Sequence, residues 1–388
     1  MLNKLIAITF LILFMRTVTA GEIFVDVDLG KDENRGDRAA PLKTFPAALA
    51  KSLPGDTIFI LPASHHINTS LVIKNKKGLP DKPIIIDGMM NTLVGTRAVS
   101  EKDWQEVSHG TGLYHRQLSS PPTGTRYFMR FNGKMERMGR HTKWKGTALK
   151  KIEELKDYEW TIAGKNEFYF KIPAGTKFAV AGVEEPFFSS GVEMSGECAH
   201  LVVRNLIVRQ FWNDGYNIHH NCRDILFENI AALENSDDGV SAHETCQVKV
   251  KNMVSIGNGT GFCHIQQSEC EHENVYIADS DSYDICLPNR SNLLKNVIVE
   301  GSAPGAIEFR DGRETLDDCL FLNRRPGVRL GFFKCETRAA GTEIAQYVIE
   351  GTLPDGVGVA ESPEALQRKI EKSRASILAV FGDKLGLK

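Results

Sequence analysis

The sequence predicts an all-β protein: a right-handed parallel β-helix solenoid with a small β-rich insertion and a C-terminal capping helix. Four cysteines recur at intervals of 24 residues: Cys198, Cys222, Cys246 and Cys270. A fixed period of this kind is the mark of a repeat architecture. Each repeat carries short segments of alternating apolar residues and no helical half. Such a repeat is too short for a propeller blade and fits one coil of a β-helix.

The first 20 residues are typical of a secretory signal peptide. Lys4 precedes an apolar run over residues 5–15, and the small residues Val18-Thr19-Ala20 follow as a cleavage site. The run is shorter than the roughly 20 apolar residues that cross a bilayer. We therefore expect an exported protein, secreted or periplasmic, with no membrane attachment after cleavage.

Two segments precede the repeats. Residues 21–95 carry strand patterns and a short helical pattern around Phe45, and we expect them to form the N-terminal cap and first coils. Residues 96–187 break the coil pattern and predict a β-rich insertion. They contain three of the four tryptophans, Trp104, Trp144 and Trp160. We expect these rings to pack in the core of the insertion, with stacking on sugars as the alternative.

Residues 188–335 hold the repeats, and residues 336–388 form a C-terminal cap. Every repeat has an asparagine before an apolar residue: Asn205, Asn229, Asn252, Asn274 and Asn296. The cysteines are expected to form an inward column of free thiols rather than disulfides, because Leu294 replaces them in the fifth repeat. Ser362 and Pro363 begin an amphipathic helix. We expect that helix to cover the exposed end of the stack.

Stacking of the coils converts the period into spatial proximity. Residues one repeat apart should lie about 4.8 Å apart on neighbouring parallel strands. Asp214 then stacks on Asp238 with Asp237 beside them, and His219 stacks on His243. Alternation along the strands places the acids and histidines on the outer face. Each Asp before a Gly could be an ordinary turn residue, but several like charges within about 5 Å are costly and indicate a functional site.

Four short motifs support a family resemblance: WNDGYNI, NSDDGVSA, GNGTGFCHI and GAIEFRDG. Their order and approximate spacing resemble the four motifs of polygalacturonase-type glycoside hydrolases, among the pectate-lyase-like right-handed parallel β-helix carbohydrate enzymes. The first two motifs match well. The third lacks the Gly-His-Gly element, with His264 coming later, and the fourth reads Glu308-Phe309-Arg310 in place of Arg-x-Lys. The resemblance implies hydrolysis with inversion.

These observations predict a carbohydrate-active enzyme that degrades a polysaccharide or oligosaccharide, and a glycoside hydrolase above all. Such hydrolysis needs one carboxylic acid and one carboxylate, and the candidate catalytic residues are Asp214, Asp237 and Asp238. The candidate substrate-binding residues are His219, His243, Glu244, His264 and Arg310. We expect no cofactor and no metal, since the histidines lack the spacing of a compact zinc motif.

Two other functions stay open. A polysaccharide lyase could use His219 or His243 as base, with Arg310 or a bound Ca²⁺ neutralising a uronate carboxylate. A non-catalytic β-helix protein that binds glycans at a surface is the other alternative. The balance of 47 Lys and Arg against 49 Asp and Glu gives a net charge of −2, which favours no nucleic-acid partner. We expect a monomer whose partner is its carbohydrate substrate.

Overall fold

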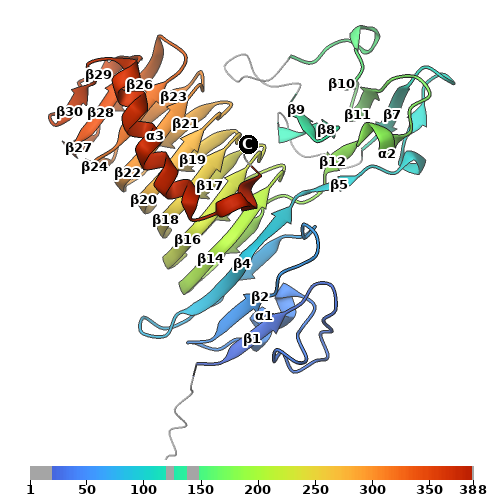
Figure 1. Ribbon diagram of the computed structural model, residues 1–388, viewed down its shortest axis with the longest axis horizontal. Coiled ribbons are helices and arrows are strands. Elements are labelled where there is room, and N and C mark those ends of the chain that lie inside the picture. The colour runs from blue at the N-terminus through green and yellow to red at the C-terminus, as the bar shows by residue number, and fades with distance from the viewer. Residues whose placement is uncertain (1–19, 119–125, 138–147, 387–388) are drawn as a thin grey trace, which may run out of the picture.

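A computed structural model describes residues 20–118, 126–137 and 148–386, and it is a solenoid of parallel strands (Figure 1). The predicted parallel β-helix is confirmed, and the strands of successive coils pair in two sheets. The predicted signal peptide falls outside the described residues except for Ala20. Within the described ranges, no helix is both long and apolar enough to cross a membrane.

One sheet, here called the long-strand sheet, contains every 10- and 11-residue strand of the described residues. Its main path consists of β1 (Glu22–Val25), β2 (Thr57–Ile60), β4 (Ile84–Val94), β14 (Ala199–Arg209), β16 (Arg223–Leu233), β18 (Gln247–Ile256), β20 (Glu269–Ala278), β22 (Ser291–Gly301), β25 (Leu320–Asn323), β28 (Thr342–Ala345) and β30 (Val357–Val359). It also includes β24 (Arg313–Asp317) and β27 (Glu336–Ala340).

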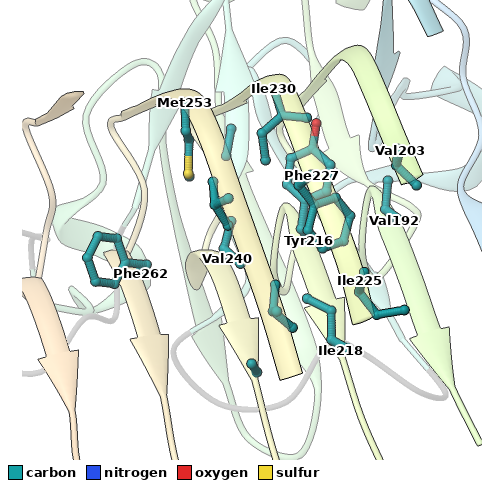
Figure 2. Packing of buried hydrophobic residues seen from close by; sticks show 14 of the residues in the cluster. Val192, Val203, Tyr216, Ile218, Ile225, Phe227, Ile230, Val240, Met253 and Phe262 are labelled. Carbon is teal, nitrogen blue, oxygen red and sulfur yellow. The ribbon is translucent and has the colours of Figure 1, made fainter. Parts of the chain in front are cut away.

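The other sheet, here called the short-strand sheet, takes one short strand from each coil. It consists of β3 (Leu71–Lys74), β13 (Val192–Ser195), β15 (Tyr216–Ile218), β17 (Asp238–Ala242), β19 (Thr260–His264), β21 (Tyr283–Leu287), β23 (Ala306–Arg310), β26 (Val328–Phe333) and β29 (Tyr347–Gly351). Its inward side chains meet those of the long-strand sheet in the core. Figure 2 shows Tyr216, Val240 and Phe262 on successive short strands, with the ring of Tyr216 beside that of Phe227.

An asparagine ladder bends the long strands. The five repeated asparagines have φ between 50° and 58°, the left-handed conformation that asparagine tolerates better than most residues. The Nδ2 of each donates to the Oδ1 of the preceding one, at 2.8–3.1 Å. After the bend, Leu206 and Val208 face the solenoid core, while Ile207 faces outward. Both faces of this half-strand are buried, which explains its continuous apolar sequence.

The cysteine column is confirmed only in part. The amide of Arg223 donates to Cys198 and that of Gln247 donates to Cys222, so Cys198, Cys222 and Cys246 stack as predicted. Cys270 instead pairs with Val248, because the spacing between paired residues falls to 22 at this coil. All eight cysteines are free thiols, as predicted.

The described part of the chain has three α-helices besides the strands: α1 (Phe45–Lys51), α2 (Phe178–Ala181) and α3 (Pro363–Ala379). The predicted C-terminal helix is therefore present, with Ser362 as its N-cap. It lies along the outer face of the long-strand sheet (Figure 1), where Leu366, Ile370 and Ile377 pack on the outward apolar residues of the strands. The sequence placed it over the end of the stack instead. The helix lies along the sheet because the outer half of each long strand carries apolar side chains, and burying them against the helix removes them from water.

The insertion forms two antiparallel sheets beside the solenoid (Figure 1). Its elements are β5 (Thr96–Ala98), β6 (Gln105–Glu106), β7 (Leu113–Gln117), β8 (Met129–Phe131), β9 (Lys134–Glu136), β10 (Glu159–Ala163), β11 (Glu167–Lys171) and β12 (Glu184–Pro186), with α2 between the last two. Trp104 and Trp160 lie in its own core, as predicted. Trp144 lies outside the described residues.

Candidate active site

The structure brings three aspartates together where the coils enter the short-strand sheet. Tyr216 on β15 pairs with Val240 on β17, so Asp214 lies beside Asp238. The amide of Asp238 donates to Asp214 Oδ1 at 3.0 Å. Asp237 completes the group, and one oxygen from each carboxyl lies within 4.8 Å of the others. The stacking that the 24-residue spacing predicts here is found.

The glycines that follow Asp214 and Asp238 are required by packing. A Cβ on Gly215 would lie 2.9 Å from the Cβ of Ala232 and 2.7 Å from the carbonyl oxygen of Gly239. A Cβ on Gly239 would lie 2.5 Å from Ser255 Oγ. Both glycines therefore let the short strand approach the inward side chains of the long strands. Neither has a positive φ, so turn conformation does not explain the Asp-Gly pairs.

Burial and mutual repulsion hold two of the acids toward their protonated form. Asp214 is 3% exposed and Asp238 is 8% exposed. Burial raises the pKa of both carboxyls well above the usual range, and the charge of Asp237 raises both further. Hydrogen bonds from the Asp238 amide to Asp214 and from Thr260 to Asp238 act in the opposite direction without overcoming burial. The cluster can therefore hold a proton at a pH where isolated carboxyls are ionised.

Asp237 differs from its neighbours because a cation compensates its charge. The guanidinium of Arg126, from the insertion, forms an ion pair with Asp237 and also donates to Asn213. A second insertion residue, Arg137, pairs with Asp281 on the same edge of the solenoid. The insertion thus contributes a charge to the acidic cluster. Sequence reasoning missed Arg126, because no repeat spacing relates the insertion to the coils.

The two outward histidines stack as predicted. The rings of His219 and His243 lie 4.0 Å apart and nearly parallel. Burial, assisted by the neighbouring His219, lowers the pKa of His243 to about 4, and its Nε2 lies 2.9 Å from Ser241 Oγ. Glu244 Oε2 lies 3.3 Å from His219 Nδ1 and accepts from the His220 amide at 2.8 Å. His219, His243 and Glu244 therefore form one polar group at the other end of these strands.

Asn217 lies on β15 between the acids and the histidines, and the sequence did not single it out. It is 8% exposed. Its Oδ1 is buried and has no hydrogen-bond partner within the part of the chain that the structure describes. A buried amide oxygen without a partner costs free energy, and a ligand hydroxyl that reached it would recover that cost. An outward asparagine that lies three residues after Asp214 and two before His219 is the signal that could have found it.

Two predicted binding residues lie apart from this group. His264 pairs with Ala242 and points into the core, where it is 0% exposed and its Nε2 lies 2.7 Å from that of His272. It therefore does not line the outer face. Arg310 lies outward on β23, several coils further along, in an ion pair with Glu308 at 2.9 Å.

Other features bear on what the site could bind. Among the described residues, Asp214, Asp237 and Asp238 are the only group of His, Cys, Asp and Glu with the geometry for a metal ion, and their oxygens would suit a hard cation such as Ca²⁺. A groove of about 780 Å³ lies elsewhere, on the outer face of the long-strand sheet, with Gln247, Lys249 and Glu271 in its lining. Its lining also includes Glu314, whose pKa burial raises to about 7. Among the described residues, however, no three of the groove's acids lie within 4.8 Å of one another, so we place the candidate site at the aspartates.

Comparison with solved structures supports the fold. Of 12 similar chains, one described as a glycoside hydrolase aligns with a TM-score of 0.54 at 11% identity, covering 90% of this chain and 98% of that one. XylC in complex with xylose aligns with a TM-score of 0.47 at 13% identity, covering 82% of this chain and 70% of that one. Pectate lyase Pel9A aligns with a TM-score of 0.39 at 13% identity, covering 88% of this chain and 82% of that one.

These neighbours are carbohydrate-active enzymes. At 11% identity, the alignment with the glycoside hydrolase shows a shared fold and nothing further. No protein-family model matches the sequence, and neither does any curated protein.

Proposed function

We propose that the protein is an exported glycoside hydrolase that cleaves a polysaccharide or oligosaccharide with Asp214, Asp237 and Asp238. One observation carries the proposal: three carboxyl groups lie within 4.8 Å of one another at the edge of a parallel β-solenoid's short-strand sheet. Such crowding separates the protonation states of neighbouring carboxyls, which acid and base catalysis of glycoside hydrolysis requires.

The environments of the three acids suggest their roles. Asp238 is buried and held toward its protonated form, so it protonates the leaving oxygen, with Asp214 sharing the proton. Asp237 is more exposed and paired with Arg126, so it acts as the carboxylate that attacks carbon or activates water. Asn217, His219 and His243 then line the sugar subsite, where the free Asn217 Oδ1 accepts from a hydroxyl.

The close spacing favours one stereochemical outcome. Carboxyl groups about 5 to 5.5 Å apart accompany retention, and those about 6.5 to 9.5 Å apart accompany inversion. The 4.8 Å limit on the oxygen separations is nearer to the first range. We therefore propose retention through a covalent intermediate on Asp237, although resemblance to polygalacturonases implied inversion.

The lyase and the non-catalytic alternatives have less support. His243 has a pKa of about 4, so it is neutral near pH 7 and could take a proton. A lyase also needs a cation to neutralise the uronate, and Arg310 is already paired with Glu308. A protein that only binds glycans would have no need for carboxyls whose crowding costs stability.

A panel of polysaccharides and aryl glycosides tests the proposal. We expect new reducing ends without ultraviolet absorbance from unsaturated products, and NMR of the first product should show retained anomeric configuration. Unsaturated products would replace the hydrolase with a lyase. Binding without any cleavage across the panel would favour the non-catalytic alternative.

A further inference from the structure

The outer face of the short-strand sheet continues from the acids toward the C-terminal coils as one row of side chains. Ser241 on β17 pairs with Cys263, Cys263 with Cys286, and Cys286 with Glu308. Each step along the row is about 4.8 Å, the spacing of parallel strands. A glycan chain lying along this row from the acids therefore reaches Glu308 within a few sugar units.

An arginine at the end of this row is already neutralised. Arg310 Nε donates to Glu308 Oε1 at 2.9 Å. Its guanidinium also lies over the ring of Phe333, 4.7 Å from the ring centre. Both the charge and one face of Arg310 are thus engaged, which leaves its remaining N–H groups and the second carboxylate oxygen of Glu308 to bind hydroxyls.

The other cations of this face are paired as well. The strands of the short-strand sheet carry three cationic side chains, and besides Arg310 these are Lys74 and Arg329. Lys74 lies 3.7 Å from Glu193, and Arg329 lies 3.2 Å from Glu350. Arg126, which the insertion contributes, is paired with Asp237.

Further acids give the face a negative excess. Asp214 and Asp238 share one proton in the proposed function, so the pair keeps one negative charge, and Glu244 carries another. None of the three has a Lys or Arg partner among the ion pairs of the described residues. A bound uronate would meet this negative field, and a free cation that could form a charge-assisted hydrogen bond with its carboxylate is lacking on these strands.

We infer that the site takes neutral, hydroxyl-rich sugars and discriminates against uronic acids, with the Glu308–Arg310 pair as a specificity-determining element. The inference rests on the proposed function in one respect only: it assumes that the glycan lies over the aspartates. It excludes the anionic polymer that the resemblance to polygalacturonases suggests.

Binding measurements separate this inference from the question of catalysis. Calorimetry would use the Asp238→Asn variant, to prevent turnover, with neutral xylo-, gluco- and galacto-oligosaccharides and with oligomers of glucuronate and galacturonate. We expect at least one neutral oligomer to bind about tenfold or more tightly than any uronate. Glu308→Gln should then shift the ratio toward uronates by about tenfold, because it releases the charge of Arg310. Glu271→Gln is the matched control, since it breaks an exposed ion pair with Lys249 on the other sheet and should leave the ratio unchanged.

The possible outcomes distinguish the preference for neutral sugars from the proposed hydrolase activity. Tighter binding of uronates, equal binding of both classes, or no binding of either would overturn the inference. An unchanged ratio in Glu308→Gln would remove the pair as the determinant. Preferential binding of neutral oligomers that the wild-type protein fails to cleave would keep the inference and refute the hydrolase.

Discussion

Among the regions of the molecule that bury carboxyl groups, two leave these groups in opposite protonation states. Glu300, on the outer face of β22 beneath α3, is 0% exposed. It accepts hydrogen bonds from Gln367, Tyr276 and Arg324 at 2.8–2.9 Å and pairs with Arg374 at 2.5 Å. Burial alone would raise the pKa of Glu300, but these partners lower it to about 2.

Asp214 and Asp238 are buried almost as deeply, yet their pKa values are raised. Each accepts few hydrogen bonds, and each faces another carboxylate in Asp237. Burial therefore does not determine the protonation state by itself; the number of donors and cations supplied to the group does. The fold stabilises the charge of Glu300 beneath the C-terminal helix, and it supplies less stabilisation to the aspartates, where we propose that a proton is transferred.

The largest expected effect is the loss of activity on removing a proton carrier from the aspartate cluster. Asp238→Asn keeps the size and the backbone amide but cannot donate the proton, so kcat should fall by at least about 10². The melting temperature should be kept or rise, because like-charge repulsion is relieved. Asp81→Asn, at an exposed position, is the control. Full activity in Asp238→Asn would make the cluster structural and end the contrast with Glu300.

Breaking the Glu300 network should cost stability without touching the chemistry. The lowering of its pKa from 4.5 to about 2 corresponds to about 3 kcal/mol at neutral pH, lost as the pH falls through the folded value. Urea unfolding of Glu300→Gln should show a loss of that size. The control Glu343→Gln, which breaks the exposed pair between Lys369 of the helix and β28, should cost less than about 1 kcal/mol. Equal losses would mean that the helix is held by apolar contacts alone.

The buried imidazoles of His264 and His272 extend the comparison to bases. Burial lowers the pKa of His272 to about 3 and that of His264 well below 6.5. Below pH 6.5 the unfolded chain then binds more protons than the folded chain, so stability should fall with decreasing pH by up to about 1.4 kcal/mol per unit for each histidine. The raised carboxyls act oppositely and lose stability as the pH rises.

The variant His264→Phe/His272→Leu removes both titrating groups. The replacements are residue types that already pack beside the pair. Phe262 stacks on the His272 ring, and Leu294 pairs with His272 on the next coil. Denaturant midpoints between pH 6.5 and 4 should therefore decline less steeply than in the wild type. Parallel curves for the two proteins would count against the buried pair as the acid-sensitive element.

The smallest expected effect is that of a chelator. If the aspartates share a proton and Asp237 is compensated by Arg126, excess EDTA should leave the activity unchanged and the melting temperature within about 1 °C. A loss of activity restored by Ca²⁺ but not by Mg²⁺ would instead make the cluster a cation site. The aspartates would then be compensated by a metal ion, whereas Glu300 is compensated by arginine side chains.

The repeat pattern predicted the parallel coils, the outward acids and the stacked histidines, because one side-chain period fixes all of them. It failed at Cys270, where the cysteine spacing stayed at 24 while the coil shortened. The asparagines recorded the true register: Asn229, Asn252 and Asn274 are 23 and 22 residues apart. Asparagine is held by its backbone conformation and its ladder, whereas a buried cysteine can occupy any inward position, so the asparagines were the better guide.

The remainder of the site depends on contacts that no period encodes. Arg126 reaches Asp237 from an insertion whose docking follows from its own tertiary fold. The pairing of Arg310 with Glu308 is visible only once both side chains are placed. The prediction of His264 as a binding residue rests on its motif and not on the register. His264 pairs with the inward Ala242, and a shift of two residues leaves the side-chain alternation unchanged, so either spacing places it in the core.

The position of α3 has a consequence for how the molecule comes apart. A solenoid couples each coil only to its neighbours, so its coils can melt one at a time from either end. The C-terminal helix contacts β18, β20, β22, β25 and β28 and joins coils that otherwise have no direct contact. Detaching one of these coils therefore disturbs the packing of the helix on all the others. We therefore expect the coils from β18 to β28 to unfold together, as a compact domain does, although a solenoid by itself favours stepwise fraying.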